Sequence, residues 1–307
     1  MGTAWRIWKE KLYLAGRRIF SGKDAFAYAL ISPAILILTL ILVFPLLYSL
    51  ILSFFQYDML HPASNHWVGW ANYLQALNDP TSSQSLLLTL NFAGCTVLVE
   101  VLLGILFALV LNVSFRGNRI SRTLILIPIM VSEVVAALSW RLLYHPDLGL
   151  LNYILSLFGV GKQIWLGPQF AMVSVMLVEI WQHTPFVTLI ILAGLQSLPK
   201  DLMEASIVDG AGGWQQFWGI TLPLLKPVIM VAVVFRTMFT LRVFTPVWVL
   251  TAGGPSNKTL VVGVNIYRTA FRYYQFGQAA TLSWLLVILT IVITVIYMRL
   301  FRREAIS

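Results

Sequence analysis

Six long runs of apolar residues limit what this chain can fold into more than any other feature of its sequence. A helix needs about 20 consecutive apolar residues to cross the hydrocarbon core of a bilayer, and each run reaches that length. Strands of a membrane barrel would instead alternate apolar and polar residues over about ten positions, which these runs do not do. The sequence therefore predicts an all-α integral membrane protein, with spans at roughly 26–55, 87–112, 123–143, 170–194, 224–245 and 278–300.

The composition agrees with a membrane protein and excludes other classes. Hydrophobic residues make up 59% of the chain and charged residues only 11%, and the mean hydropathy is +0.82. Average soluble domains are about half apolar and about a quarter charged, so an ordinary cytosolic enzyme is excluded. The net charge of +9 would fit a nucleic-acid partner, but most basic residues lie beside the apolar runs. We therefore expect lipid, and no nucleic acid, as the partner of this charge.

The distribution of Lys and Arg predicts the orientation, because short cytoplasmic loops carry an excess of basic residues. With the N-terminus in the cytoplasm, 14 of the 21 Lys and Arg residues fall on the inner side and 4 in the outer loops. The sequence thus predicts six spans with both termini cytoplasmic. Residues 1–24 form a basic segment, either an interfacial helix or a tail that only sets topology, and 25–307 form the membrane domain.

The sequence lacks the motifs of common catalytic sites. No glycine-rich loop precedes a Lys at the spacing that binds phosphates, and no two histidines have the spacing of a zinc hydrolase. The sequence also contains no nucleophile elbow of the G-x-S-x-G type. We therefore expect a chain that is not an enzyme and that binds no metal or cofactor itself. If it moves a solute, the energy comes from an ion gradient or from a partner.

Ionisable residues within the spans are candidates for a solute pathway, because burying them in a bilayer is costly. Glu179 and His183 lie four residues apart and so on one face of span four. Glu100 lies in span two and Arg236 in span five. Such groups also pair with each other for packing or reach the interface, as we expect for Arg242. The pathway candidates are Glu179, His183, Gln182, Trp181, Arg236, Thr240, Asn91 and Glu133.

The mixture of side chains in spans four and five suits a hydroxyl-rich ligand. Sugar sites combine aromatic faces with carboxylate, amide and guanidinium groups. A small zwitterion fits the same groups, and arginine side chains also suit an anionic ligand. The pattern therefore favours a polyhydroxy solute and leaves these other ligands open.

The loop between spans four and five, 198–223, has a pattern of its own. Asp201 stands where it can cap a short helix that runs to about Val208, and Gly210 can adopt the positive φ that ends this helix. A second short helix, at about 213–219, leads into span five. The loop is too apolar for a solvated linker, so we expect the groove of a partner protein to cover it.

This loop resembles the EAA loop in the permease subunits of binding-protein-dependent ABC importers. That loop reads Glu-Ala-Ala, then Asp-Gly-Ala, then Ile-x-Leu-Pro, and the spacing here is intact, with a serine in place of the second alanine. The outer Thr-Ala-Gly-Gly-Pro sequence at 251–255 is similar to the carbohydrate branch, and there to the first of its two permeases. The resemblance covers roughly 26–300. The matching positions are Glu204, Ala205, Ser206, Asp209, Gly210, Ala211, Ile220, Leu222 and Pro223.

The resemblance implies that this chain is a multi-pass permease of an importer in the inner membrane. It also implies a second permease, an extracytoplasmic solute-binding protein, and two ATPase subunits that use ATP and Mg and contact the loop. The solute would be a sugar, or alternatively a polyol, a glycerol phosphate or an osmolyte. The alternative of another class is a gradient-driven secondary transporter with Glu179 and His183 as a proton relay, although the sequence shows no inverted internal repeats that would support it. A membrane-embedded enzyme such as a glycosyltransferase would need paired carboxylates at a membrane edge, and the acidic residues are too dispersed for that.

Labelling of introduced cysteines tests the predicted topology. The thiol introduced by Ser64→Cys should react with a membrane-impermeant reagent in intact cells, because 56–86 is an outer loop. The thiol introduced by Ser307→Cys should react only after permeabilisation. Both variants carry Cys95→Ala, which removes the single natural cysteine, and Cys95→Ala alone is the control. The opposite labelling pattern would contradict the orientation.

Overall fold

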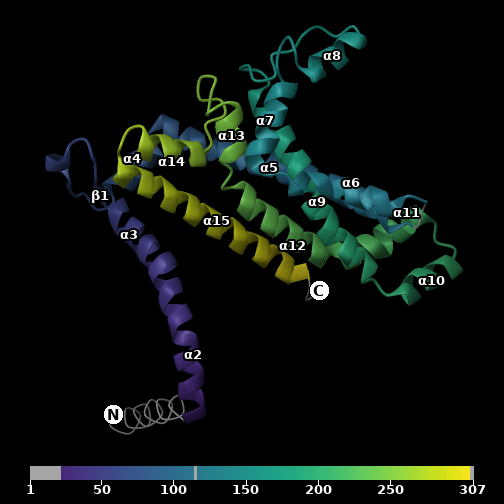
Figure 1. Cartoon of the computed structure of the whole chain (residues 1–307). Coiled ribbons are helices and arrows are strands. Elements are labelled where there is room, and N and C mark those ends of the chain that lie inside the picture. The colour runs from purple at the N-terminus through teal and green to yellow at the C-terminus, as the bar shows by residue number, and fades with distance from the viewer. Residues whose placement is uncertain (1–21, 114–115, 305–307) are drawn as a thin grey trace. The chain divides into compact units, whose positions relative to one another are not determined.

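The computed structural model describes residues 22–113 and 116–304 (Figure 1). The segment 1–24, with its expected interfacial helix, lies outside the described residues except for its last three. The chain divides into two compact units, Met1–Leu52 and Ser53–Ser307.

The described part of the first unit is a continuous helical run. It consists of α2 (Gly22–Leu38), the π-helical turn η1 (Thr39–Val43) and the first nine residues of α3 (Phe44–Ser53). The π turn ends two residues before Pro45, which lacks the backbone N–H that a regular helix would use. Large apolar side chains along this run are exposed within the unit, as expected for a helix that faces lipid or a partner helix.

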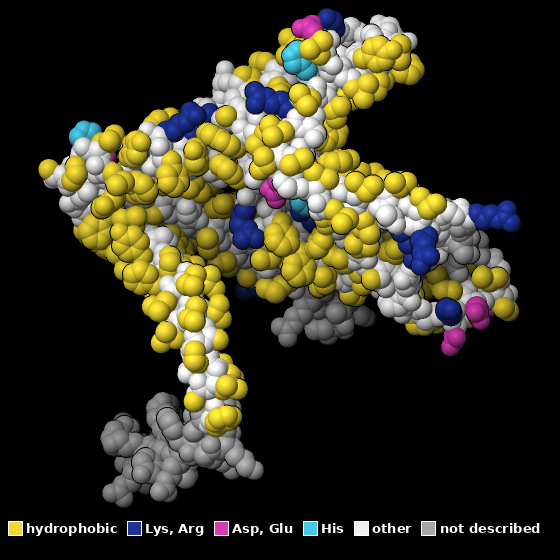
Figure 2. All heavy atoms as spheres, viewed as in Figure 1, with side chains coloured by type: hydrophobic (Ala, Val, Ile, Leu, Met, Phe, Trp, Pro, Cys, Tyr) yellow, Lys and Arg dark blue, Asp and Glu magenta, His cyan; other side chains and the backbone are white. Residues whose placement is uncertain are grey.

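Four long helices of the second unit are also apolar enough to cross a bilayer. They contain α5 (Pro80–Asn112), α9 (Ala171–Gln196), α12 (Leu222–Thr240) and α15 (Phe276–Glu304). The described residues thus hold five candidate spans, or six if one bent pair of helices counts as a span. Hydrophobic side chains cover much of the visible surface of these helices (Figure 2).

The third predicted span, 123–143, is not one helix. It consists of α6 (Asn118–Met130) and α7 (Glu133–Leu143), which meet at an angle of 98°. The two residues between them have extended backbones, and Pro128 removes a backbone donor from the last turn of α6. The expectation of a single continuous third helix is therefore corrected to a pair of helices with a sharp break.

The loop after α9 forms α10 (Lys200–Val208) and α11 (Gly213–Gln216), and the π-helical turn η3 (Phe217–Thr221) then passes directly into α12. Residues Gly213–Thr240 are consequently one continuous helix. The predicted first short helix is confirmed, and the second is also helical but continues into span five without a break. Pro223 lies within this helix just after the π turn, and it lacks the N–H that a regular helical bond would use.

Shorter elements complete the second unit. The strands pair in an antiparallel ribbon, with Phe55 opposite Trp67. In Figure 1, α4 and α14 lie at the end of the long helices that is farthest from α10 and α11. The shorter elements are β1 (Phe55–Gln56), the 3-10 turn η2 (Pro62–Ser64), β2 (His66–Trp67), α4 (Ala71–Asn78), α8 (Leu150–Leu157), α13 (Thr245–Leu250) and α14 (Val262–Phe271).

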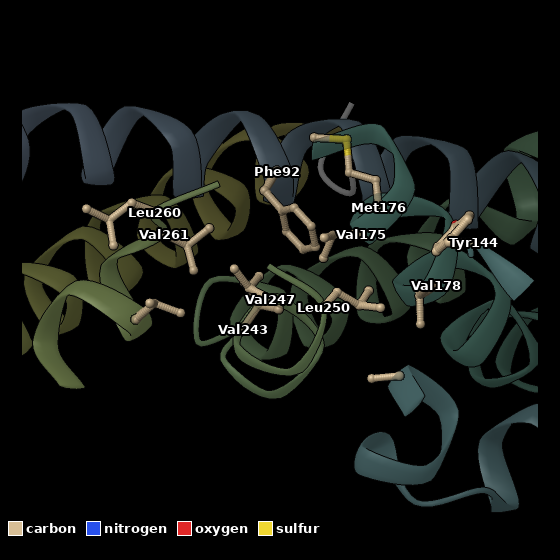
Figure 3. Close-up of a cluster of buried hydrophobic side chains, with 12 residues drawn as sticks. Phe92, Tyr144, Val175, Met176, Val178, Val243, Val247, Leu250, Leu260 and Val261 are labelled. Carbon is tan, nitrogen blue, oxygen red and sulfur yellow. The ribbon is translucent and has the colours of Figure 1, made fainter. Parts of the chain in front are cut away.

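Close packing of α5 against α9 forms the centre of the second unit. Phe92 of α5 is fully buried and extends toward Val175 of α9 in a cluster of apolar side chains (Figure 3). Further along α5, the two helix backbones come close together, because Gly104 lies directly against Val187 of α9. A Cβ atom at Gly104 would be only 2.6 Å from Cγ1 of Val187. The absence of a side chain at Gly104 therefore sets the distance between the two helices.

Alanine substitution of two glycines on α5 tests this packing. Gly104→Ala is expected to destabilise the protein by about 1–3 kcal/mol, because the added methyl group overpacks the interface. Gly94→Ala is the matched control, since no described residue lies within 4 Å of a Cβ atom built there. Thermal unfolding of the purified protein in detergent measures both variants. Equal midpoints for the two variants would show that the contact with Val187 does not limit helix packing.

Candidate functional site

The ionisable residues inside the long helices meet at one place. Arg236 of α12 directs one edge of its guanidinium at the carboxylate of Glu100 on α5. Its Nε donates to Oε2 at 2.7 Å and its Nη2 to Oε1 at 2.8 Å. This two-bond geometry is the strongest common pairing of a guanidinium with a carboxylate. Two helices far apart in sequence are thereby joined in the apolar interior.

A third helix, α9, adds two more members. Nη2 of Arg236 also donates to Oε1 of Glu179 at 2.9 Å. The same oxygen lies 3.2 Å from Nδ1 of His183, one helical turn further along. We call Glu100, Glu179, His183 and Arg236 the charge cluster. It contains the three predicted pathway residues Glu179, His183 and Arg236, together with Glu100, whose position in span two gave no sign of its partner.

Burial makes this pairing obligatory. Arg236 is 2% exposed, Glu100 0% and Glu179 5%, and an unpaired charge at such depth is very costly. The ligand atoms of Glu100, Glu179 and His183 lie within 4.8 Å of one another, close enough to surround a cation. Arg236 already supplies that cation, because its guanidinium bonds both carboxylates. The four side chains of the charge cluster therefore form an ion network with one another.

A cavity of about 480 Å³ opens beside the charge cluster. Its walls include Glu179, His183 and Arg236, and the exposed side chains of Glu133 and Arg242. We call it the central cavity. Arg242 is exposed and lies over the ring of Phe239 at 5.7 Å, so its charge reaches the cavity. The remaining lining residues are mostly apolar: Ile129, Phe186, Phe239, Val243, Phe244, Thr245 and Pro246.

The amide of Gln182 holds the break between α6 and α7. Its Nε2 donates to the carbonyl oxygen of Val131 at 2.8 Å, which satisfies a backbone acceptor that a helix would otherwise use. Gln182 does not line the central cavity. It instead fixes the break at which Glu133 begins α7, so it positions a residue of the cavity wall.

Three other predicted pathway residues lie apart from the central cavity. Trp181 is partly exposed and packs edge-on against Trp140 of α7. Thr240 is fully buried, and its hydroxyl has no hydrogen-bond partner among the described residues. Asn91 is exposed on α5. The structure therefore brings together four of the eight candidates: Glu133, Glu179, His183 and Arg236.

The second predicted site, the loop at α10 and α11, is tied together by side chains. Gln216 of α11 donates from Nε2 to the hydroxyl of Ser206 at 2.8 Å and to the carbonyl of Met203 at 3.1 Å. Ser206 is 6% exposed. The serine that departs from the alanine of the EAA pattern is thus a bonding residue, because an alanine would leave Gln216 with one partner fewer.

The backbone of this loop follows the sequence prediction in part. Gly210 has a φ of +80°, as expected for the residue that ends α10. Asp201 is not the cap of α10, because Pro199 occupies the cap position. Asp201 lies instead in the first turn, where its charge favours the positive end of the helix dipole.

The outer surface of the loop is apolar with a few charges. Val208 is 87% exposed and Trp214 75%, values that are unusual for such side chains unless a partner covers them. Glu204, Ala205 and Asp209 are exposed beside them. The other motif residues, Ala211, Ile220, Leu222 and Pro223, are partly buried or exposed along the way into α12.

A multi-pass helical protein with paired charges beside a cavity has the construction of a membrane solute transporter. Comparison with known families agrees, since residues 100–304 match the family described as binding-protein-dependent transport system inner membrane component. The chain belongs to this family. It is therefore a permease component of a transport system and not an enzyme.

Individual relatives cover nearly the whole chain. The probable ABC transporter permease protein y4oQ of Sinorhizobium fredii is 39% identical over 277 residues, 90% of each chain. The trehalose/maltose transport system permease protein MalF of Thermococcus litoralis is 37% identical over 283 residues, 90% of this chain and 94% of that one. A solved bacterial ABC transporter involved in the import of the acidic polysaccharide alginate matches with a TM-score of 0.82 and 25% identity, covering 97% of this chain and 99% of that one.

Substitutions in the charge cluster test its contribution to stability. Arg236→Gln leaves two carboxylates buried without their shared cation and should cost about 3–5 kcal/mol. Glu100→Gln should also destabilise, but combined with Arg236→Gln it should cost clearly less than the two single changes added together. Thermal unfolding in detergent measures each variant. Arg242→Gln is the control, because this exposed arginine should change stability by no more than about 0.5 kcal/mol. Additive costs in the double variant would show that the pair does not interact.

Proposed function

We propose that this chain is the transmembrane permease subunit of an ATP-driven importer that carries a neutral sugar or a related polyhydroxy solute. Its family membership and a relative named for trehalose and maltose transport support the importer and the sugar. The observation that carries the choice of a neutral solute is the pairing of Arg236 with two carboxylates.

The charge balance of the central cavity explains this choice. The guanidinium of Arg236 is engaged by Glu100 and Glu179, so it offers little free charge to an anion. The cavity combines this network with aromatic side chains such as Phe186 and Phe239. Carboxylate, imidazole and guanidinium groups bond hydroxyls, and aromatic rings pack against the apolar faces of sugar rings.

An anionic polyhydroxy solute, such as a sugar acid or a glycerol phosphate, is the second candidate. The exposed guanidinium of Arg242 at the cavity favours it, as does the structural likeness to an importer of an acidic polysaccharide. Polyols and osmolytes would use the same hydroxyl-bonding groups.

The proposed topology has six spans, with α6 and α7 together making one broken span. Both termini and the α10–α11 loop are then cytoplasmic, in the inner membrane, and α4 and α14 lie on the outer side. The excess of Lys and Arg in the inner segments supports this orientation.

The proposed complex contains a second permease subunit, two ATPase subunits and an extracytoplasmic solute-binding protein. ATP and Mg are used on the ATPase subunits, and this chain binds neither, because its sequence has no phosphate-binding loop. The exposed apolar side chains of α10 and α11 form the proposed contact with an ATPase groove. Glu204 would accept charge-assisted hydrogen bonds from a basic residue there.

The continuity of the helix Gly213–Thr240 supplies a mechanism that couples the ATPase subunits to the central cavity. The bonds of Gln216 to Ser206 and Met203 make α10 and α11 move together. From Gln216 to Arg236 the helix extends about 30 Å, at about 1.5 Å per residue. A displacement of the loop by the ATPase pair is therefore carried along one element to the charge cluster and the central cavity.

Reconstitution of the chain with its partner subunits in proteoliposomes tests this function. Labelled trehalose, maltose or a related sugar should accumulate only with ATP and the binding protein, whereas uptake driven by a proton gradient alone would support the secondary-transporter alternative. Gly210→Val should strain the positive φ by about 1–2 kcal/mol or more, and this variant and Glu204→Lys should both lower uptake and binding-protein-stimulated ATP hydrolysis. The matched control is Gly213→Val, because Gly213 has no positive φ and no neighbour within 4 Å of an added Cβ atom in the described part of the chain. Full stimulation in both test variants would exclude this loop as the coupling element.

A further inference from the structure

A second cavity lies at the end of the long helices opposite the α10–α11 loop, and the proposed function gives it no role. It has a volume of about 310 Å³ and lies between α4, the start of α5, α14 and the start of α15. We call it the outer cavity. About 19 residues of α5 separate Thr81, on its wall, from Glu100, which corresponds to about 28 Å along a helix. The outer cavity is therefore distinct from the central cavity.

The lining of the outer cavity is polar, unlike that of the central cavity. Its polar and aromatic lining includes Gln75, Asp79, Thr81, Arg268, Tyr273 and Gln278. They provide amides, a carboxylate, a hydroxyl, a guanidinium and an aromatic ring within one small space. This is the set of groups that recognises the hydroxyls and ring face of a sugar.

Hydrogen bonds within the protein fix Asp79 and Arg268 and leave part of their bonding capacity unused. Asp79 accepts from the backbone and the hydroxyl of Ser82 through Oδ2 alone. Arg268 donates from Nη1 to Asn257 at 2.9 Å and from Nη2 to the carbonyl of Ala252 at 2.6 Å. Its Nε is buried with no hydrogen-bond partner among the described residues. A fixed donor without an acceptor is costly in a folded protein unless a ligand or water completes it.

The size and the charge of the outer cavity limit which ligands can bind there. A volume of about 310 Å³ lies at the lower end of the range for small-molecule sites, about 300–1,000 Å³, so it suits one sugar ring and not an oligosaccharide. Asp79 and Arg268 contribute opposite charges, so the cavity selects neither anions nor cations. The combination fits a neutral, hydroxyl-rich ring.

We infer that the outer cavity is a sugar subsite, which binds one ring of the transported solute at the extracytoplasmic entrance before the solute reaches the central cavity. This inference rests on the proposed function, because the orientation and the solute class come from it. Asp79 accepts hydrogen bonds from ring hydroxyls, Arg268 and Gln278 donate to them, and Tyr273 packs against the ring.

Protection of introduced thiols by sugar tests the subsite. Thr81→Cys and Gln278→Cys, each with Cys95→Ala, place a thiol on different walls of the outer cavity. The full complex with each variant is reconstituted in proteoliposomes. A hydrophilic thiol reagent is then added outside, with and without glucose, maltose or trehalose, and labelling of this chain is measured by mass spectrometry. Asn78→Cys is the matched control, because Asn78 is exposed beside the cavity but does not line it.

The sugar that the complex imports should slow labelling in both cavity variants and leave the control unchanged. At a concentration about ten times the dissociation constant, the labelling rate should fall about tenfold by mass action. Equal slowing in Asn78→Cys, or slowing only when the binding protein docks without sugar, would overturn the subsite and indicate a protein contact. If the sugar is imported but does not slow labelling of the cavity variants, the subsite is overturned and the proposed function stays intact. If no sugar is imported and none protects, both proposals fail.

Discussion

One guanidinium in the apolar interior holds three helices of this protein together. Arg236 of α12 bonds the carboxylates of Glu100 on α5 and Glu179 on α9, and His183 completes the group. On a solvated surface such pairs contribute little, because water competes for each charge. Inside a bilayer, separating the helices would leave bare charges in hydrocarbon. The position of the central cavity, whose wall includes three of these residues, depends on this network.

The network also explains how a distant loop can act on the cavity. The continuous helix Gly213–Thr240 begins with α11, in the loop that is proposed to be cytoplasmic. The same helix carries Arg236. Gln182 on α9 adds a second connection, since its side chain donates a hydrogen bond to the carbonyl oxygen of Val131, at the break between α6 and α7. Movement of α12 against α9 would therefore alter both the ion network and the wall formed by Glu133. A transporter needs such a link, because its energy is delivered far from its solute.

The sequence predicts the long helices well, because length and apolarity alone decide whether a segment can cross a bilayer. The broken third span was not predictable in this way. Its extended residues are held by Gln182, 51 positions later in the chain, and such a tertiary bond leaves no local signal. The members of the charge cluster differ in the same way: Glu179 and His183 could be paired from helical spacing, whereas Glu100 and Arg236 are 136 positions apart. The outer cavity has no local signal in the sequence, because its polar residues come from four separate segments.

The π-helical turn Phe217–Thr221 gives the helix Gly213–Thr240 a property that no side chain could supply. A π turn holds one residue more than the α turn it replaces, so it acts as an inserted spacer of a single residue. Both kinds of turn close a full circle, so deleting that residue would restore a regular helix and leave α11 facing nearly the same way relative to Arg236. The extra residue therefore changes the backbone hydrogen bonds of this turn and not the direction in which the loop faces. A deletion of one residue in the regular part of α12 would instead rotate α11 and the attached loop by about 100° relative to Arg236.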